Sequence, residues 1–331
     1  MLDQQAILGG SQQRIHAAYG TTSAGAGMER LYLSAVILMT LSSVGTAQQS
    51  TGRSLPDILR KTASYVARFQ QDFARVIADE DYDQTQDTGH NVIRRTMHSE
   101  VLSVWIAAQR GWMWARNPIT VNGRPVPDSR VHLDRLLDAD LVDALKLSKL
   151  RDEGARFNLG GVYHNFNDPT FVIGFLDRSV QPRFNFKLEG MTKIAGRTAA
   201  KLAFVERQRP TLIRSHDRDA PASGTVWIDA DSGAVVRTRL DVKLYSAAAV
   251  KATGGYSPDP VNTVETSAEV DVDYVPDAAL DLCVPREMRE DLVAALVMHG
   301  QSRTVIDHVK SVARYSNARK FTTAARIVPQ H

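Results

Sequence analysis

Cysteine is almost absent from this chain of 331 residues, and its charges follow no block pattern. The single cysteine, Cys283, excludes an internal disulfide, and its apolar neighbours Leu282 and Val284 favour a small buried side chain over a nucleophile. The 40 basic and 37 acidic residues are mixed along the sequence and give a net charge of +3. Without a basic block there is no electrostatic footprint for nucleic acid, and we expect no nucleic-acid partner.

The spacings that mark catalytic and metal sites are missing as well. None of the nine histidines forms a His-x-x-x-His pair or joins Cys283 at zinc spacing. There is no G-x-S-x-G elbow, no Walker loop and no dinucleotide fingerprint. Ser215-His216-Asp217 contains the residue types of a catalytic triad, but a triad is defined by geometry in space. We therefore expect no catalysis, no metal and no cofactor, and an enzyme is the least supported class.

The acidic run from Asp79 to Asp83 has the alternate carboxylates that open a calcium loop. The later positions of such a loop fail, because Gln84 stands in place of glycine and His90 in place of glutamate. Exposed charges at a junction of helix and strand are the better interpretation.

One long apolar run is present, from Leu31 to Val44, followed by the small residues Gly45-Thr46-Ala47. The run is shorter than the roughly 20 residues of a membrane-spanning helix and resembles an export signal. We expect residues 28–47 to be a cleaved signal peptide and residues 1–27 to be a non-native or disordered extension. No cysteine follows Ala47 to carry a lipid, so the predicted product is periplasmic or secreted, without a stable transmembrane anchor. An uncleaved membrane anchor is the alternative.

Helical periodicity follows this segment. Ser54 suits an N-cap, Pro56 suits a first turn, and apolar residues recur at three-to-four spacing as far as Ile77. The stripe comprises Leu55, Ile58, Leu59, Thr62, Val66, Phe69, Phe73 and Val76. A second helical region is expected as an insertion within residues 130–177.

Strand periodicity dominates the remainder. Val235 to Leu244 and Val264 to Tyr274 alternate apolar with charged residues, which predicts antiparallel strands with one face in water. Further strands are expected within residues 92–107, 112–121, 183–188, 200–206, 305–315 and 321–328. Helices first and strands after, with no βαβ alternation, predict a single α+β domain over residues 54–331.

The stretch from Gly224 to Arg237, GTVWIDADSGAVVR, places aspartates between two hydrophobic runs. Asp231-Ser232-Gly233 has turn chemistry, since Asp and Ser can bond local backbone and Gly supplies positive φ. Asp229 has no histidine, cysteine or distant carboxylate at ligand spacing. We therefore predict a hairpin here and no metal site.

These features together resemble a known group. Phe184-Asn185-Phe186, the Gly224 to Asp229 strand, the Gly233 turn and Leu282-Cys283-Val284-Pro285 resemble uncharacterised exported bacterial proteins over most of residues 54–328. They are more distantly similar to the outer-membrane lipoprotein carrier (LolA-like) family. That resemblance implies a curved antiparallel sheet, an incomplete β-barrel, packed on an N-terminal helix. In the carriers the concave apolar face binds acyl chains, and no catalytic residue is attached to these motifs.

The leading hypothesis is a protein that binds a lipid or another apolar ligand in the concavity of a half-barrel. The aromatic residues expected to line it are Trp105, Trp114, Phe184, Phe186, Phe204 and Trp227. The alternative is a structural or protein-interaction module of the cell envelope whose cavity is filled by its own helices. Its partner would then be another envelope protein in place of a lipid or acyl chain.

Overall fold

The structure is a computed structural model that describes residues 54–73, 76–106, 111–127, 144–160, 167–215, 218–247, 263–297 and 304–320. All of these residues belong to one compact unit, Ser50–His331. The predicted signal peptide, the extension before it and the expected strand at residues 321–328 lie outside the described residues.

Three α-helices and thirteen strands are described. The helices are α1 (Leu55–Asp72), α3 (Ala144–Ala155) and α4 (Phe171–Phe175), with a short 3-10 turn at Gln181–Arg183. The strands of the first half are β1 (Val76–Asp87), β2 (Val92–Ile106), β3 (Gly111–Val121) and β4 (Arg124–Pro125). Those that follow are β5 (Phe184–Ile194), β6 (Arg197–Glu206), β7 (Arg214–Ser215), β8 (Arg218–Asp219) and β9 (Ser223–Asp229). The last four are β10 (Val235–Ala247), β11 (Thr263–Asp277), β12 (Leu282–Val297) and β13 (Thr304–Lys320).

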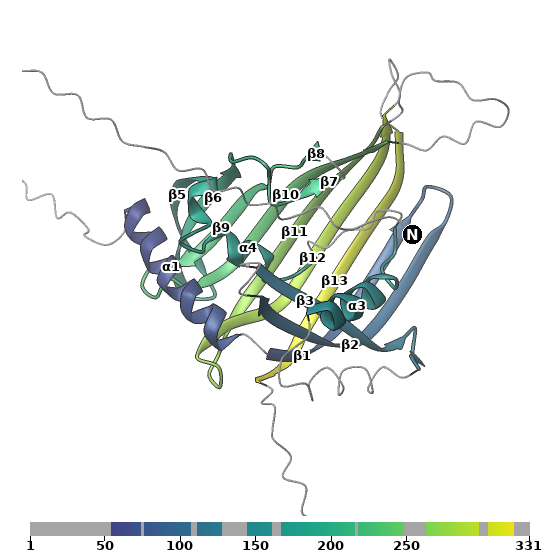
Figure 1. Cartoon of the computed structure of the whole chain (residues 1–331), viewed down its shortest axis with the longest axis horizontal. Coiled ribbons are helices and arrows are strands. Elements are labelled where there is room, and N and C mark those ends of the chain that lie inside the picture. The colour runs from purple at the N-terminus through teal and green to yellow at the C-terminus, as the bar shows by residue number, and fades with distance from the viewer. Residues whose placement is uncertain are drawn as a thin grey trace, which may run out of the picture. The chain divides into compact units, whose positions relative to one another are not determined.

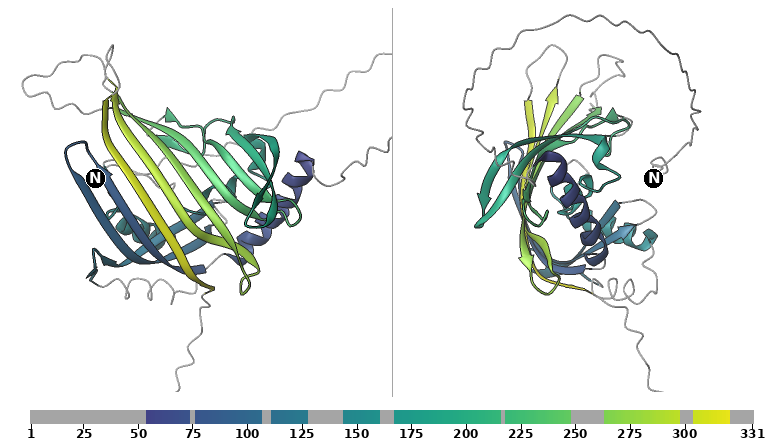
Figure 2. Two further views of the ribbon diagram at one scale, coloured as in Figure 1. Left: turned by 180° about the vertical axis from the view of Figure 1, so that it is seen from behind. Right: turned by 90° about the vertical axis from the view of Figure 1, so that its left-hand side faces the viewer.

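Eleven of these strands form one antiparallel sheet, in the order β4-β3-β2-β1-β13-β12-β11-β10-β9-β6-β5. The first strand, β1, pairs with the last, β13, so that Glu80 faces Tyr315 and Tyr82 faces Ala313. The sheet of described strands does not close, because β4 and β5 remain at its two edges. It curves around α1, with α3 and α4 on the same side (Figures 1 and 2). The expected α+β fold with a curved, open antiparallel sheet is confirmed.

Helix α1 begins where the sequence predicts. Ser54 is its N-cap and accepts a hydrogen bond from the backbone N–H of Asp57, and Pro56 lies in the first turn. The helix buries a stripe that includes Ile58, Val66 and Phe69 against the concave face of the sheet. It ends at Asp72, earlier than expected, because Val76 and Ile77 belong to β1.

The opposite face of the sheet is the predicted wet face, which we call the outer face. Arg239 pairs with Asp271 across β10 and β11 at 2.8 Å, and Arg314 pairs with Asp83 across β13 and β1 at 3.1 Å. Exposed pairs of this kind contribute about 0–1 kcal/mol each. Their main consequence is that the outer face is polar, so the apolar side chains of the same strands gather on the concave, inner face.

Two long strands, β1 and β12, are not predicted by the sequence pattern. In β1 the acidic run replaces the β-branched residues that mark a strand. In β12 the alternation fails at both ends, since residues 282–285 are all buried and so are Ala294 and Ala295. Register shifts lie next to both places, at Asp273/Tyr274 and at Ala294/Ala295. A bulge turns successive side chains to one face and removes the period of two.

The predicted β9–β10 hairpin is present, and its turn touches α1. Gly233 has φ +76°, and a Cβ on it would lie 2.7 Å from the carbonyl carbon of Lys61. The ammonium of Lys61 donates to the carbonyl of Ala230 in the same turn. Asp229 accepts from the backbone N–H groups of Asp231 and Ser232. The aspartates therefore shape a turn, and the missing side chain of Gly233 lets the helix backbone approach it.

Replacing Gly233 by alanine is expected to lower the free energy of unfolding by roughly 2–5 kcal/mol, because a strained left-handed residue and a clash with α1 add together. Urea unfolding measures the change. Gly123→Ala is the matched control, since Gly123 also has positive φ but a methyl group there would meet none of the described atoms within 4 Å. It should show the strain alone, roughly 1–2 kcal/mol. Equal losses in the two variants would show that the contact with α1 contributes nothing.

Candidate functional site

The inner face of the sheet carries two groups of side chains with different chemistry. One, the aromatic half, consists of Phe175, Phe184, Phe186 and Phe204 on α4, β5 and β6. The other, the polar half, consists of Glu80, Tyr82, Arg116 and Glu290 on β1, β3 and β12. The strand order places β5 and β3 near opposite edges of the sheet. Helix α4 nevertheless contacts both β10 and β3, so it lies between the two halves (Figure 1).

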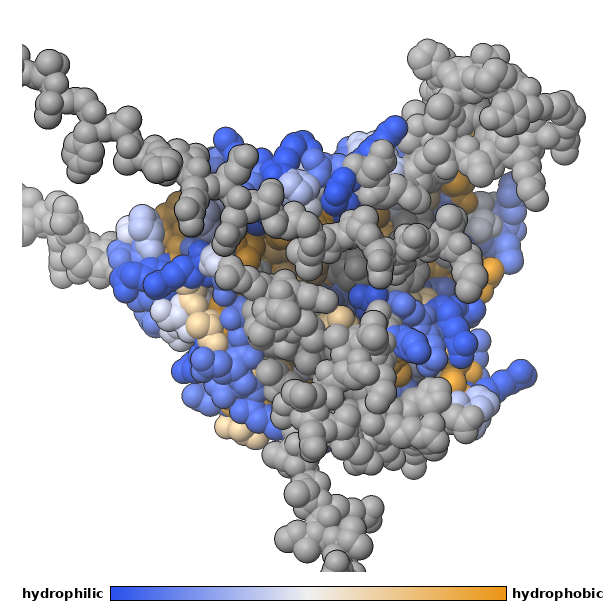
Figure 3. Space-filling model, viewed as in Figure 1, coloured by the Kyte–Doolittle hydropathy of each residue, from blue (hydrophilic) through white to orange (hydrophobic). Residues whose placement is uncertain are grey.

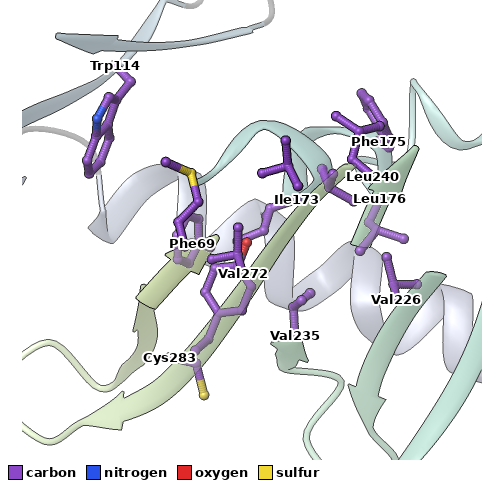
Figure 4. Close-up of a cluster of buried hydrophobic side chains, with 14 of the residues drawn as sticks. Phe69, Trp114, Ile173, Phe175, Leu176, Val226, Val235, Leu240, Val272 and Cys283 are labelled. Atoms are coloured by element: carbon purple, nitrogen blue, oxygen red, sulfur yellow. The ribbon is translucent and has the colours of Figure 1, made fainter. Parts of the chain in front are cut away.

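The aromatic half is a tightly stacked cluster. The rings of Phe175 and Phe184 are stacked with centroids 4.7 Å apart, and Phe204 meets both edge-on at 5.8 Å. Phe204 faces Gly224 across the β6–β9 pair, where the absence of a side chain leaves room for the ring. Figure 4 shows Phe175 and Leu176 of this cluster beside Val226 and Leu240 of the sheet. Aromatic pairs in such geometry contribute about 0.5–1.5 kcal/mol beyond the area they bury.

The rim of the aromatic half is only partly buried. Phe186 and Leu188 lie on β5, the edge strand, and pack against the core while remaining partly accessible. Further partly buried apolar side chains pack against the same core cluster, among them Leu55, Leu59, Phe171 and Val180. Hydrophobic surface is visible beside α1 on this face of the molecule (Figure 3). The aromatic half is therefore partly accessible at the edge of the sheet, at Phe186 and Leu188.

The polar half is built around a buried ion pair. Glu80 has no exposed surface, and both its carboxylate oxygens accept hydrogen bonds from Arg116, one of them at 2.8 Å. The guanidinium lies 4.3 Å from the ring centroid of Tyr82, whose hydroxyl donates to Glu290 at 2.5 Å. The alternation of β1 explains the arrangement, since Glu80 and Tyr82 point inward while Asp79, Asp81 and Asp83 do not. The expectation that this acidic run is exposed is therefore wrong for Glu80.

Burial and charge fix the protonation states in the polar half. Burial alone would lower the pKa of Arg116, but the facing carboxylate of Glu80 raises it above its ordinary value. Burial, and then the carboxylate of Glu290, raise the pKa of Tyr82 well above the ordinary value for a phenol. Tyr82 consequently stays a hydrogen-bond donor, and Arg116 stays a cation, across the physiological range.

The helical insertion is held over the polar half by hydrogen bonds. The carbonyl of Phe157, just beyond α3, accepts from Arg95 at 2.6 Å and from Gln84 at 3.3 Å, and the N–H of Leu159 donates to Gln84. Gly154 of α3 packs directly on the backbone of Arg116, where a Cβ would lie 2.4 Å from the carbonyl oxygen. Part of the polar chemistry of the inner face therefore serves to dock this insertion.

The structure separates the six predicted lining residues. Phe184, Phe186 and Phe204 come together in the aromatic half, and Trp114 lies on the inner face near the polar half. The backbone of Trp105 lies on β2 opposite Trp112, but its side chain is outside the described part of the chain. Trp227 occupies the outer face, because its neighbours Val226 and Ile228 point into the core and Arg237 lies over its ring. It takes no part in an inner lining.

Sequence reasoning does not anticipate Glu80, Arg116 or Glu290. The available signal is the alternation of acidic and aromatic residues from Asp79 to Asp83, which reads as a strand once Tyr82 is taken as an inward position. The partners on β3 and β12 follow only from the strand pairing, which brings together segments far apart in sequence.

A groove of about 600 Å³ lies on the outer face, across β10, β11 and β12. Its walls include Asp241, Glu269 and Asp291 with Lys243 and Tyr245. Burial raises the pKa of both Asp241 and Glu269, against the opposing effect of the Arg239 guanidinium. The lining of this groove combines these charged groups with apolar side chains such as Val242 and Val293.

The described residues hold no group of three or more His, Cys, Asp or Glu side chains placed to bind a metal ion. Cys283 is buried, and burial raises the pKa of its thiol, which is unfavourable for a nucleophile. Among the described helices, none has the length and apolar character needed to cross a membrane.

Comparison with known proteins gives distant structural similarity only. No family model matches the chain, and no curated protein matches it. A DUF1329 family protein from Desulfovibrio piger matches with a TM-score of 0.35 and 10% identity, over 82% of this chain and 95% of that one. A domain assigned to outer membrane lipoprotein sorting, from Vibrio parahaemolyticus, matches with a TM-score of 0.35 and 10% identity, over 80% and 95%. MucB, in a complex with MucA, matches with a TM-score of 0.19 and 10% identity, over 77% and 94%. The distant likeness to the lipoprotein carriers expected from the sequence is thus found among these structures.

One ionisable group lies where the chain enters α4. Asp168 is buried and accepts hydrogen bonds from the backbone N–H and the hydroxyl of Thr170, at 2.7 and 2.6 Å. The next residue, Pro169, accepts a hydrogen bond from the hydroxyl of Tyr274 on β11. Burial raises the pKa of Asp168 to about 6, against the opposing effect of the bonds from Thr170. Neutral Asp168 therefore favours the docked position of α4.

The raised pKa makes stability depend on pH. The unfolded carboxyl titrates near 3.8, so the folded state is favoured fully below that pH and loses the advantage as pH rises through about 6. The free energy of unfolding should fall by roughly 3 kcal/mol over this range relative to Asp168→Asn, which cannot ionise. Urea unfolding of both proteins at several pH values between 4 and 7 measures this difference. Thr170→Val should extend the loss to higher pH, whereas a pH-independent difference for Asp168→Asn would contradict the assignment.

Proposed function

We propose that the protein binds a lipid or another apolar ligand on the inner face of its half-barrel, with the aromatic half as the site for the chain. The observation that carries this proposal is the stacked phenylalanine cluster whose rim, at Phe186 and Leu188, stays accessible at the edge of the sheet. The cluster offers rings and aliphatic carbons without a charged group among its members, which is the lining an acyl chain requires.

Burial of the chain would supply the binding energy. Each buried methylene contributes about 0.8 kcal/mol, so a contact with a few methylenes along the rim already gives useful affinity. On the outer face of the described strands, Arg237 and Arg239 pair with carboxylates of β11, so charged groups lie among the apolar side chains there. The proposal places the ligand on the inner face.

The proposed setting is the periplasm or the exterior of the cell, reached through the export signal in residues 28–47. The lone cysteine is buried, so an oxidising compartment would not readily modify its thiol. The proposal includes no catalysis, and the candidate residues form a binding surface.

A second candidate is a module that binds another envelope protein, and dense packing of the interior favours it. Helix α1 and the residue after it insert Phe69 and Phe73 into the same cluster that contains Phe184 and Phe204, and all four are buried. A half-barrel filled by its own helix would present its edges and its outer face to a partner. The two candidates differ in whether the protein carries lipid.

Introducing a charge at the rim tests lipid binding. Phe186→Glu should weaken the binding of a fluorescent fatty acid at least tenfold, because a carboxylate would then lie against the bound chain. Fluorescence titration of the protein purified from its native compartment measures the affinity, and mass spectrometry of the same preparation identifies any lipid that co-purifies.

Val205→Glu is the matched control. Val205 lies on β6 beside Phe204 but on the outer face, where it is 48% exposed, so the added charge should not alter binding. Equal weakening in both variants would place the ligand away from the aromatic half. A wild-type protein with neither co-purified lipid nor affinity for the probe would favour the protein-interaction module.

A further inference from the structure

Two buried polar groups on the inner face have no hydrogen-bond partner among the described residues. Trp114 on β3 is 8% exposed, and its indole Nε1 meets no acceptor in that part of the chain. Ser103 on β2 has no exposed surface, and its hydroxyl likewise bonds to none of the described groups. The two residues are directly paired across β2 and β3, so their side chains lie next to each other on one face.

Leaving such groups unpaired is costly. A buried donor without an acceptor destabilises the folded protein by about 1–3 kcal/mol, because the donor gave up its hydrogen bond to water. Two such donors double this penalty. The indole N–H can only donate, so whatever satisfies it must be an acceptor, and the hydroxyl of Ser103 can donate to the same atom. The ring of Tyr315 holds Trp114 edge-on, with centroids 5.5 Å apart, so the indole is fixed in place.

The site belongs to the same buried cluster as the proposed acyl site, and Figure 4 shows Phe69 and Ile173 between Trp114 and Phe175. Trp114 belongs to the same buried cluster as Phe69 and Phe175 (Figure 4). Helix α4, which carries Phe175, also contacts β3, the strand of Trp114. A chain lying along the inner face from the aromatic half would therefore approach Trp114 with its other end.

The surrounding charge favours a neutral acceptor. The polar half contains the carboxylates of Glu80 and Glu290 and the guanidinium of Arg116, a formal sum of two negative charges and one positive, while the nearby cation Arg95 is bonded to the carbonyl of Phe157. Both oxygens of Glu80 already bind Arg116, so the guanidinium of the polar half is engaged and would not neutralise an added carboxylate. A free fatty acid would bring a third negative charge into this region, whereas an ester or amide carbonyl would not.

We propose that Trp114 and Ser103 form a subsite for the carbonyl oxygen of an acyl ester or amide whose chain occupies the aromatic half. The subsite rests on the proposed lipid-binding function and specifies its ligand as an uncharged acyl derivative. Two donors from adjacent strands converge on one acceptor, and the aromatic half receives the hydrocarbon.

The test compares methyl oleate with a hydrocarbon of the same chain length, each used to displace a bound fluorescent acyl reporter. Trp114→Phe and Ser103→Ala should each weaken methyl oleate about three- to tenfold, the usual effect of losing one hydrogen bond. Neither should change the affinity for the hydrocarbon. Oleate at pH 8 should bind more weakly than methyl oleate to the wild-type protein.

The matched controls lie on the outer face. Trp227→Phe removes an indole that takes no part in the subsite, and Ser267→Ala removes a hydroxyl that already donates to the carbonyl of Val293. Both should leave all three affinities unchanged. Urea unfolding of each variant without ligand separates loss of folding from loss of binding, because removing an unpaired donor should not lower stability.

Three results would overturn the subsite. The inner-face variants could weaken ester and hydrocarbon equally, which would indicate a general packing effect. They could leave both affinities unchanged while lowering stability, which would indicate that the two donors are satisfied by buried water only. Stronger binding of oleate than of methyl oleate would contradict the neutral ligand. If no probe binds the wild-type protein, the acyl-binding function itself fails, which is a separate outcome.

Discussion

An open sheet of eleven strands must put one face in water and cover the other, and this constraint governs the rest of the molecule. The outer face is suited to water because it carries cross-strand ion pairs such as Arg239 with Asp271. Among the described elements no second large sheet packs on the inner face. Helix α1 covers part of this face with a stripe of large apolar side chains, and the insertion that contains α3 covers another part. The two coverings differ in kind, since α1 packs mainly by apolar contact and the insertion docks by hydrogen bonds from Gln84 and Arg95.

The division of the inner face into an aromatic and a polar half follows from these coverings. Phenylalanines gather where α1 and α4 exclude water, and Glu80 pairs with Arg116 where the insertion presents backbone carbonyls. A buried ion pair of this type is weak evidence for stability, because desolvation offsets most of the attraction, but breaking it leaves an uncompensated charge. Its clearer effect is on position, since it fixes the guanidinium over Tyr82 and so orders the surface beside Trp114.

The sequence predicts the fold class, the cap and stripe of α1 and the β9–β10 hairpin because each depends on local chemistry. It does not predict β12, since bulges at both ends hide the alternation, and it assigns Glu80 to solvent because a run of acids reads as exposed. Part of the candidate site follows from alternation, which puts Phe184 and Phe186 on one face of β5, whereas Phe204 joins them only through the pairing of β6 with β5. The pairing of Ser103 with Trp114 depends on strand register, which no pattern of single residues encodes.

The pairing of β1 with β13 also determines when the sheet can be completed. During synthesis β1 emerges first, but one of its two neighbours is the last strand of the described chain. Until residues 304–320 have been made, β1 and β12 each have an unpaired edge, and the polar half cannot assemble because Glu80 and Glu290 lie on strands joined only through β13. The strands from β4 to β1 and those from β12 to β5 are therefore joined into one sheet only when β13 takes its place between β1 and β12.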